Sequence, residues 1–487
     1  MKLLFPLALC LTACTQALPE GITRPFPTDF RWGTAVAGFQ VDMGCATWSD
    51  ADCLDTASDW YQWVTDPAIT GDKNLFVTGQ DVREGPGMWE LFEKDVAQMK
   101  ADGHTSLRLS LEWSRLFPTE PADPTDPTTL GAAANPAAVA RYHEMFAALR
   151  DAGIEPLVTV NHYTLPLWVH DGVACHKNLT TCEANGWVDG DRIIPRIAAF
   201  SEWAGMEFGG QVDQWATLNE PFATALSGYL QPGADRSAPP GLTLQGAPSI
   251  AVIRNQIEGH ARMYEALKSG DTVDASGQGV PANVGIVLNM VDITPEDPVA
   301  DATVAQHADH LYHRLFLEAL TSGEWDDDLD GTFDRTRPEL AEHVDWFGIN
   351  YYNEMKVRHF IQLFPDIVPA FDFLPTVSWD PHPEGLAKVL AIAATYGKPL
   401  FVTENGTPDV EHARDILDDH LASLWSAIDA GADVRGYNYW SYIDNYEWNH
   451  GMDMQFGLYS YDPITKARTA RPAAERYRDI VAQGGLE

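Results

Sequence analysis

Two glutamates, each near the end of an apolar segment, are the residues of this chain best suited to chemistry. Glu220 lies in the sequence TLNEP at 217–221, and Glu404 lies in VTENG at 402–406. Cleavage of a glycosidic bond needs two carboxyl groups on opposite sides of one sugar, because one protonates the departing oxygen while the other attacks or stabilises the anomeric carbon. We therefore predict that Glu220 and Glu404 form such a pair.

The segments around the glutamates belong to a regular alternation. Eight apolar, β-branched runs occur at 30–38, 105–113, 155–163, 214–220, 283–290, 345–352, 399–404 and 434–442. Helical patterns at 87–101, 136–152, 193–209, 249–267, 303–321, 383–396 and 413–430 separate them. This order predicts an α/β fold, a single-domain (β/α)8 TIM barrel with loop insertions. The alternative, an open doubly wound sheet, would normally carry a glycine-rich phosphate turn, and none is evident.

Polar residues fall at the carboxyl ends of these runs, where barrel enzymes place their sites. They are Gln40, Arg108, Asn161, His162, Asn219, Glu220, Asn350, Tyr351, Tyr352, Glu404 and Trp440. Residues that served stability alone would be scattered along the strands.

An ordered set of motifs gives the chain a family resemblance. Besides the two glutamate motifs it contains GFQ at 38–40, LSLEWSR at 109–115, GINYY at 348–352, PEGL at 383–386 and WSYIDNYEW at 440–448. With these motifs, residues 26–480 resemble glycoside hydrolase family 1, the β-glucosidase and β-galactosidase family, and in particular its archaeal β-glycosidase-like branch.

The resemblance implies roles for individual residues. Glu220 would be the acid/base and Glu404 the nucleophile, supported by Arg108, Asn350 and Tyr352. Gln40, His162, Asn219 and Glu447 would contact the rim of the sugar, with Trp440 as its platform and Trp448 as a further rim donor. Simpler alternatives are solvated acids, a core histidine, a salt-bridged Glu447 and core tryptophans, although the polar neighbourhood 444–447 argues against full burial of the tryptophans.

Some positions depart from the usual family pattern. Tyr163 follows His162 where the family usually has tryptophan, Asp42 and Met43 replace a glutamate and a glycine, and Gln455 replaces an arginine. Residues 449–454 hold no lysine or arginine for a sugar phosphate. The substrate is therefore expected to be an unphosphorylated sugar.

The expected activity is that of a retaining exo-β-glycosidase, β-glucosidase-like, with β-galactosides and β-fucosides as further candidate substrates. Its partner would be an oligosaccharide or glycoside substrate, without a metal or an organic cofactor, and its carboxyl groups would be about 5 Å apart. A transglycosylase and a non-catalytic sugar-binding surface lipoprotein are the alternatives.

The amino terminus predicts export. Lys2 precedes a short apolar stretch at 3–11, and LTAC at 11–14 resembles a bacterial lipobox. We expect a signal peptide at 1–13, a lipid on Cys14, a tether at 14–25 and the catalytic barrel at 26–487. The protein would then be anchored by its lipid to the cell envelope. An ordinary signal peptide with a fortuitous cysteine is the alternative.

The remaining cysteines and the charge agree with an exported protein. Cys45 and Cys53, like Cys175 and Cys182, form a local pair, as expected for disulfides in an oxidising compartment. A shared metal site is the weaker alternative. A formal charge of −38 makes nucleic acid an unexpected partner.

An acidic segment at 326–334 imitates the start of a calcium loop. It contains Asp326, Asp328, Asp330 and Gly331. The twelfth position is Arg337, where a bidentate glutamate is required. A solvated acidic loop is therefore the preferred interpretation.

Overall fold

The computed structural model describes residues 21–359 and 373–487, and its central feature is a closed barrel of eight parallel strands. The strands follow chain order around the barrel: β2 (Arg31–Ala35), β3 (Ser106–Ser110), β4 (Glu155–Asn161), β5 (Gln214–Asn219), β6 (Asn283–Asn289), β10 (Trp346–Asn350), β13 (Leu400–Asn405) and β14 (Val434–Trp440), which pairs with β2. Each strand overlaps one predicted run. The predicted TIM barrel is confirmed, and the open-sheet alternative is wrong.

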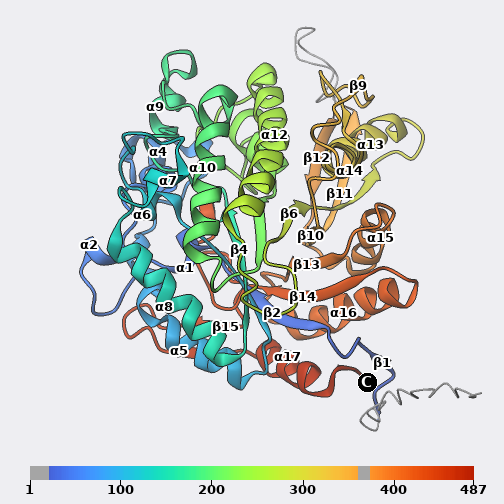
Figure 1. Ribbon diagram of the computed structural model, residues 1–487. Helices are drawn as coiled ribbons and strands as arrows, with labels where there is room; N and C mark the ends of the chain where they lie inside the picture. Colours follow the sequence, from blue (N-terminus) through green and yellow to red (C-terminus); the bar gives the residue numbers. More distant parts are fainter. Residues whose placement is uncertain (1–20, 360–372) are drawn as a thin grey trace, which may run out of the picture.

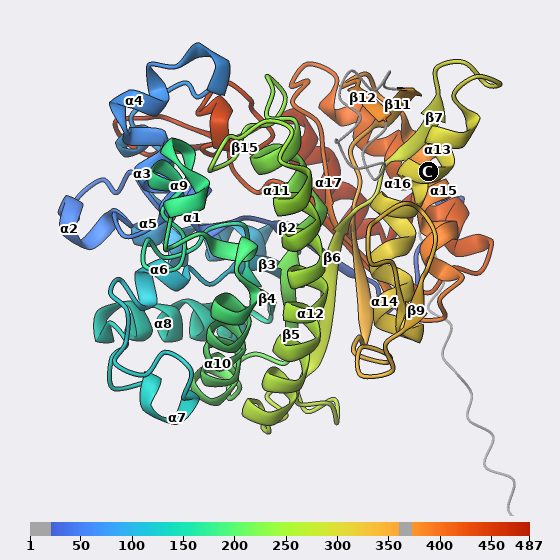
Figure 2. The same ribbon diagram turned by 90° about the horizontal axis from the view of Figure 1, so that it is seen from above.

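Helices surround the strands on the outside (Figures 1 and 2). They include α5 (Met88–Ala101), α8 (Pro136–Ala152), α10 (Gly190–Phe208), α12 (Gly246–Gly270), α15 (Pro383–Ala394), α16 (Ala413–Asp429) and α17 (Pro472–Gln483). The predicted helix at 303–321 is divided into α13 (Ala302–Asp309), the π-helical turn η6 (His310–Arg314) and α14 (Leu315–Ser322). The carboxyl end lies beside the first described segment, because β17 (Gly485–Leu486) pairs with β1 (Arg24–Pro25).

The boundaries of α8 illustrate how the sequence defines these elements. The Asn135 side chain accepts a hydrogen bond from the Ala137 N–H, and Pro136 occupies the first helical position, where no N–H is needed. Gly153 follows the last helical residue as the carboxyl-terminal cap, with a φ of 78° that favours glycine. Strand β4 begins two residues later, so these caps determine where the strand enters the barrel.

Large side chains fill the barrel interior. Trp346 and Phe401 meet edge to face with ring centroids 5.2 Å apart, in a buried cluster with Leu157, Ala216 and Val287. A Cβ atom on Gly285 would lie 2.3 Å from the Trp346 indole, so only glycine leaves room for this ring. The interior is therefore a packed core beneath the carboxyl end of the barrel.

The strand register is irregular near that carboxyl end. Shifts occur between Ala216 and Asn219 in the β5–β6 pair and between Ile349 and Asn350 in the β10–β13 pair. Such irregularities redirect side chains and are common beside active sites. A separate sheet of β7 (Asp292–Pro295), β11 (Glu354–His359) and β12 (Phe373–Val377) is built from the segments that follow β6 and β10.

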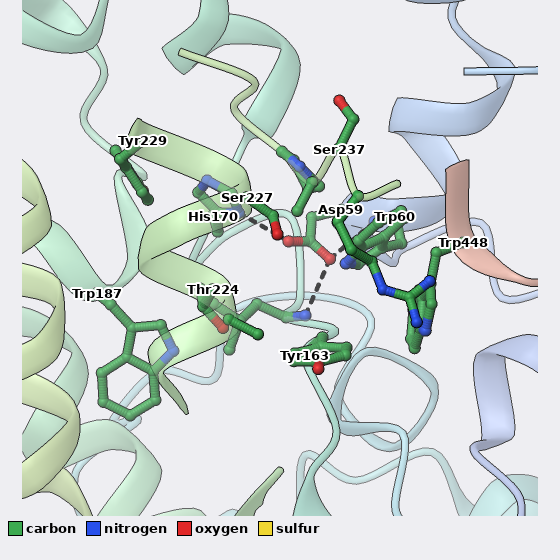
Figure 3. A pocket seen from close by; sticks show the side chains of 15 residues that line it. Asp59, Trp60, Tyr163, His170, Trp187, Thr224, Ser227, Tyr229, Ser237 and Trp448 are labelled. Atoms are coloured by element: carbon green, nitrogen blue, oxygen red, sulfur yellow. Dashed lines mark hydrogen bonds and ion pairs between the residues drawn. The ribbon is translucent and has the colours of Figure 1, made fainter. Parts of the chain in front are cut away.

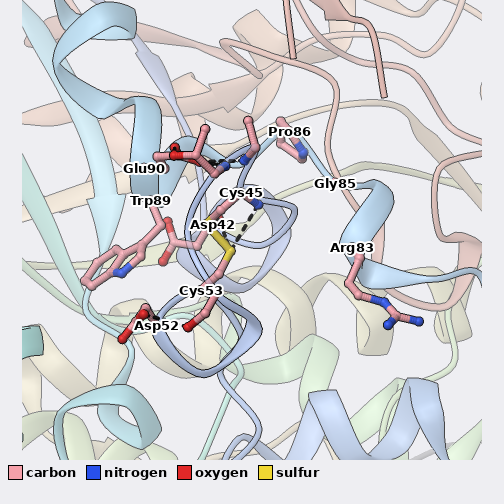
Figure 4. The surroundings of a disulfide bond; sticks show 12 residues. Asp42, Cys45, Asp52, Cys53, Arg83, Gly85, Pro86, Trp89 and Glu90 are labelled. Carbon is pink, nitrogen blue, oxygen red and sulfur yellow. Dashed lines mark hydrogen bonds between the residues drawn. A yellow bond between two sulfur atoms is a disulfide. The ribbon is translucent and has the colours of Figure 1, made fainter. Parts of the chain in front are cut away.

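Two disulfides fasten loops of the chain. Cys45 is joined to Cys53 and Cys175 to Cys182, so these four cysteines are not free to bind a metal together. Figure 4 shows the first disulfide, in a loop that Glu90 also holds by accepting hydrogen bonds from backbone amides.

Part of the predicted amino-terminal organisation lies outside the described residues. This applies to the signal segment 1–13, to Cys14 and to tether residues 14–20. Within the two described ranges, no helix is both long enough and apolar enough to cross a membrane.

Candidate active site

The two predicted acids belong to one network at the carboxyl end of the barrel. Glu220 follows β5, and Glu404 lies near the end of β13. A continuous series of hydrogen bonds runs through Glu404, Arg108, Asn219, Asn350 and Glu220. Because the same three side chains link them, the two carboxyl groups belong to one polar cluster.

The other predicted residues join the same cluster. The His162 ring is stacked with those of Trp440 and Trp448, with centroids 6.0 and 5.9 Å away. The amide of Gln40 donates to Glu447 at 2.9 Å. These contacts bring Gln40, His162 and Glu447 together with the two tryptophans in one cluster.

Two contacts stabilise a negative charge on Glu404. Its carboxyl group forms an ion pair with the Arg108 guanidinium and accepts a 2.6 Å hydrogen bond from the Tyr352 hydroxyl. Burial raises the pKa of Glu404 to about 7, the Arg108 charge opposes this rise, and the charge of Glu220 adds to it. The Arg108 guanidinium and the Tyr352 hydroxyl both stabilise the ionised form of Glu404 against this effect of burial.

Glu220 is held in an unusual backbone conformation. Its φ of 45° lies in the left-handed region, as do those of Tyr163 and Trp448 at 67° and 50°. Such conformations in non-glycine residues cost on the order of 1–3 kcal/mol each and cluster at functional sites. Asn350 Nδ2 donates to one oxygen of Glu220 at 2.8 Å, and the Tyr163 hydroxyl lies 2.5 Å from the other.

The direction of these hydrogen bonds follows from Arg108. An arginine can only donate, so the Asn219 atom 2.7 Å from Arg108 Nη2 must be the carbonyl oxygen Oδ1. Asn219 Nδ2 then donates to His162 Nε2 at 3.1 Å, which puts the imidazole proton on Nδ1. Burial lowers the pKa of His162 well below its usual value, so the ring is neutral.

Two buried polar atoms of the cluster lack a hydrogen-bond partner in the described part of the chain. They are His162 Nδ1, a donor, and Gln40 Oε1, an acceptor. Buried polar atoms are almost always paired with a protein group or an ordered water, so an unpaired one calls for a partner from outside the protein. A hydroxyl group can satisfy both kinds of atom, so this part of the cluster suits a sugar.

Arg236 is a member of the site that the sequence did not reveal. Its Nη1 lies 3.0 Å from Glu447 Oε1, and Gln40 holds the other oxygen of Glu447. Glu447 is therefore a salt-bridged acid as well as a buried member of the site. No motif or periodicity marks Arg236, because it comes from an irregular loop between η5 (Leu226–Leu230) and α12.

The expectation that the two tryptophans escape full burial is wrong. Trp440 is 3% and Trp448 4% exposed. The neighbouring acids are buried as well, because Arg471 forms two 2.6 Å hydrogen bonds with Asp444 and because Glu447 is paired as described above. Both indoles belong to the apolar wall of the site.

Two cavities lie beside the cluster, and Glu220 lines the larger of them. The larger, of about 360 Å³, is lined by Glu220, Tyr352 and Trp379 among others and is large enough for a leaving group. The smaller, of about 40 Å³, is lined by Tyr163, Trp448 and further aromatic residues (Figure 3). Arg236 lines both cavities and therefore lies between them.

The acidic segment at 326–334 lies apart from this site. Carboxylate oxygens of Asp326, Asp328 and Asp334 lie within 4.8 Å of one another. However, the Asp326 carboxylate already accepts hydrogen bonds from His310 and from the backbone of Gly331. Arg337, at the twelfth position, is paired with Glu258 and Glu339.

Comparison with known proteins places this geometry in a family. The model of "Glycosyl hydrolase family 1" matches residues 22–486. A β-galactosidase of Pyrococcus woesei is 32% identical, over 95% of this chain and 98% of its own, and one of Saccharolobus solfataricus is 31% identical, over 95% and 96%. The β-glycosidase structure of Thermosphaera aggregans is 27% identical, with a TM-score of 0.81 over 95% of this chain and 98% of its own. The chain belongs to glycosyl hydrolase family 1.

Proposed function

We propose that the protein is a retaining exo-β-glycosidase in which Glu404 is the nucleophile and Glu220 the acid/base. Glu404 attacks the anomeric carbon while Glu220 protonates the departing oxygen, so the C–O bond breaks and a glycosyl-enzyme forms. Glu220 then takes a proton from a water molecule while the oxygen of that water attacks the same carbon. The bond to Glu404 breaks, and the sugar leaves with its original configuration.

The different surroundings of the two acids carry this assignment. A nucleophile must be ionised, and Glu404 contacts a guanidinium and a hydroxyl donor. An acid/base must gain and lose a proton beside the leaving group, and Glu220 contacts uncharged donors and lines the larger cavity. The presence of both acids in one network disfavours the non-catalytic sugar-binding alternative.

Replacing Arg108 with methionine is expected to move the acidic limb of the kcat/KM–pH profile upward by about 1 unit or more. The guanidinium lowers the pKa of Glu404, so its loss raises that pKa further above 7, and Glu404 becomes ionised only at higher pH. Initial rates on a nitrophenyl β-glycoside between pH 4 and 9 measure this effect. Arg435→Met, at an exposed surface ion pair, is the control, and an unmoved or lowered acidic limb in Arg108→Met would contradict the assignment.

The substrates we propose are β-linked glucose, galactose and fucose, at non-reducing ends of oligosaccharides or on aryl and alkyl groups. Support comes from the sugar-rim residues and from relatives named β-galactosidase in Pyrococcus woesei and β-glucosidase A in Thermotoga maritima. A panel of nitrophenyl glycosides tests this choice. Product analysis at rising acceptor-sugar concentration separates hydrolysis from transglycosylation.

We further propose that the protein is exported and anchored to the cell envelope by a lipid on Cys14. The lipobox-like sequence at 11–14 and two disulfides, which suit an oxidising compartment, support this proposal. Expressed in a bacterium, the wild type should incorporate labelled palmitate and sediment with membranes, whereas Cys14→Ser should do neither and keep its activity. Unlabelled, soluble wild type would contradict the anchor.

A further inference from the structure

Tyr163, one of the residues that depart from the family pattern, contacts Glu220. The Tyr163 hydroxyl lies 2.5 Å from Glu220 Oε2. A left-handed backbone at Tyr163 directs its ring, which packs edge-on against His162 and Trp448 with centroids 5.3 and 5.1 Å away. Figure 3 shows Tyr163 beside Trp448 at the small cavity. The tryptophan usual in the family has no hydroxyl to place there.

The two oxygens of Glu220 have chemically different partners. Arg108 donates to Asn219 Oδ1 and so fixes the orientation of that amide. Asn350 Nδ2 donates to Asn219 Oδ1 at 3.1 Å and to Glu220 Oε1 at 2.8 Å. The NH2 group of Asn350 cannot accept a hydrogen bond, so a proton on Glu220 Oε1 would find no acceptor in Asn350. A hydroxyl can both donate and accept. Oε2 is therefore the better place for the proton of Glu220.

We propose that Tyr163 is a positioning residue that keeps the exchangeable proton of Glu220 on Oε2, an inference that rests on the acid/base role proposed for Glu220. When Glu220 is protonated, the Tyr163 oxygen accepts from Oε2–H, and when it is ionised, the Tyr163 hydroxyl donates to Oε2. In the first step the Oε2 proton passes to the glycosidic oxygen, which keeps the electron pair of the broken C–O bond. In the second step a proton of water returns to Oε2.

Tyr163 itself keeps its proton throughout. Burial and the neighbouring Glu220 charge raise the pKa of Tyr163 well above its usual value. Other groups that act electrostatically with Glu220 come from separate elements of the barrel: Glu404, Arg236, Tyr312 and Tyr352. Removal of the Tyr163 hydroxyl leaves these groups in place, so a change in the proton chemistry of Glu220 can be assigned to that hydroxyl.

Tyr163→Phe tests the proposal because it removes the hydroxyl and keeps the ring. Without its donor, ionised Glu220 is less stable, so the acid holds its proton to higher pH and gives it up less readily. We expect the basic limb of the kcat/KM–pH profile to move to higher pH. For an alkyl β-glucoside, kcat/KM should fall on the order of tenfold. For 2,4-dinitrophenyl β-glucoside, whose leaving group needs no proton, it should change little.

The control is Tyr229→Phe, a buried tyrosine that lines the same small cavity and should leave both the profile and the leaving-group dependence unchanged. An unshifted basic limb in Tyr163→Phe, or an equal loss on both substrates, would overturn the proposal and leave Tyr163 a packing residue. Glu220→Ala is measured in parallel. If Glu220→Ala loses activity equally on the alkyl and the dinitrophenyl glucoside, the acid/base role of Glu220 is wrong. If only Tyr163→Phe shows an equal loss, the role of Glu220 stands and that of Tyr163 is wrong.

Discussion

Glu404→Gly is expected to lower the hydrolysis of every β-glycoside substrate by about 10⁴-fold or more, because no group remains to form the covalent intermediate. Sodium azide should restore turnover of 2,4-dinitrophenyl β-glucoside. The small anion can occupy the space of the lost carboxylate beside Arg108 and Tyr352 and attack the same face of the sugar. The product should be the α-glycosyl azide, with inverted configuration, as identified by NMR.

Glu404→Gln is the matched control for this experiment. It removes the charge but leaves the space filled, so it should be as inactive as Glu404→Gly and gain nothing from azide. Near-normal hydrolysis by either variant, or a β-configured azide from Glu404→Gly, would contradict the nucleophile assignment.

Glu220→Ala should separate substrates by their leaving groups. For alkyl glycosides we expect kcat/KM to fall by about 10²- to 10⁴-fold, because no acid protonates the departing oxygen. With the dinitrophenyl glucoside, the variant should form the glycosyl-enzyme at the wild-type rate and release a burst of dinitrophenol. Turnover after the burst should be slow because no base activates water. Azide, which needs no base, should accelerate that turnover and yield the β-glycosyl azide.

The configuration of the azide product distinguishes the two acids. Glu220→Gln should reproduce the leaving-group dependence of Glu220→Ala, since an amide cannot transfer the proton. Equal losses on alkyl and dinitrophenyl substrates, or an α-configured azide from Glu220→Ala, would place Glu220 outside proton transfer.

The barrel could be predicted because parallel strands buried on both faces appear in the sequence as continuous apolar runs. The predicted run at 214–220 and strand β5 (Gln214–Asn219), for example, differ by one residue. The π-helical turn η6 (His310–Arg314) could not be predicted, because one extra residue per turn barely changes the hydrophobic pattern of the surrounding helix. The register shifts at the strand ends depend likewise on contacts between strands.

The site could be predicted where its residues lie in motifs, and not where they depend on distant partners. The burial of Trp448 differs from the prediction because acids nearby in the sequence favour an exposed position, whereas their partners Arg236 and Arg471 come from other parts of the chain. Tyr163 was noticeable as a departure from the family pattern. Its contact with Glu220 nevertheless follows from a left-handed backbone that the sequence does not specify.

The most direct test of the central claim is to trap the covalent intermediate with a 2-deoxy-2-fluoro-β-glucoside that carries a dinitrophenyl leaving group. The fluorine slows both steps, and the activated leaving group makes the first step faster than the second. Peptide mass spectrometry should find one sugar per chain, attached to the carboxylate of Glu404. A label on another residue, or turnover with inverted configuration and no covalent adduct, would contradict the account.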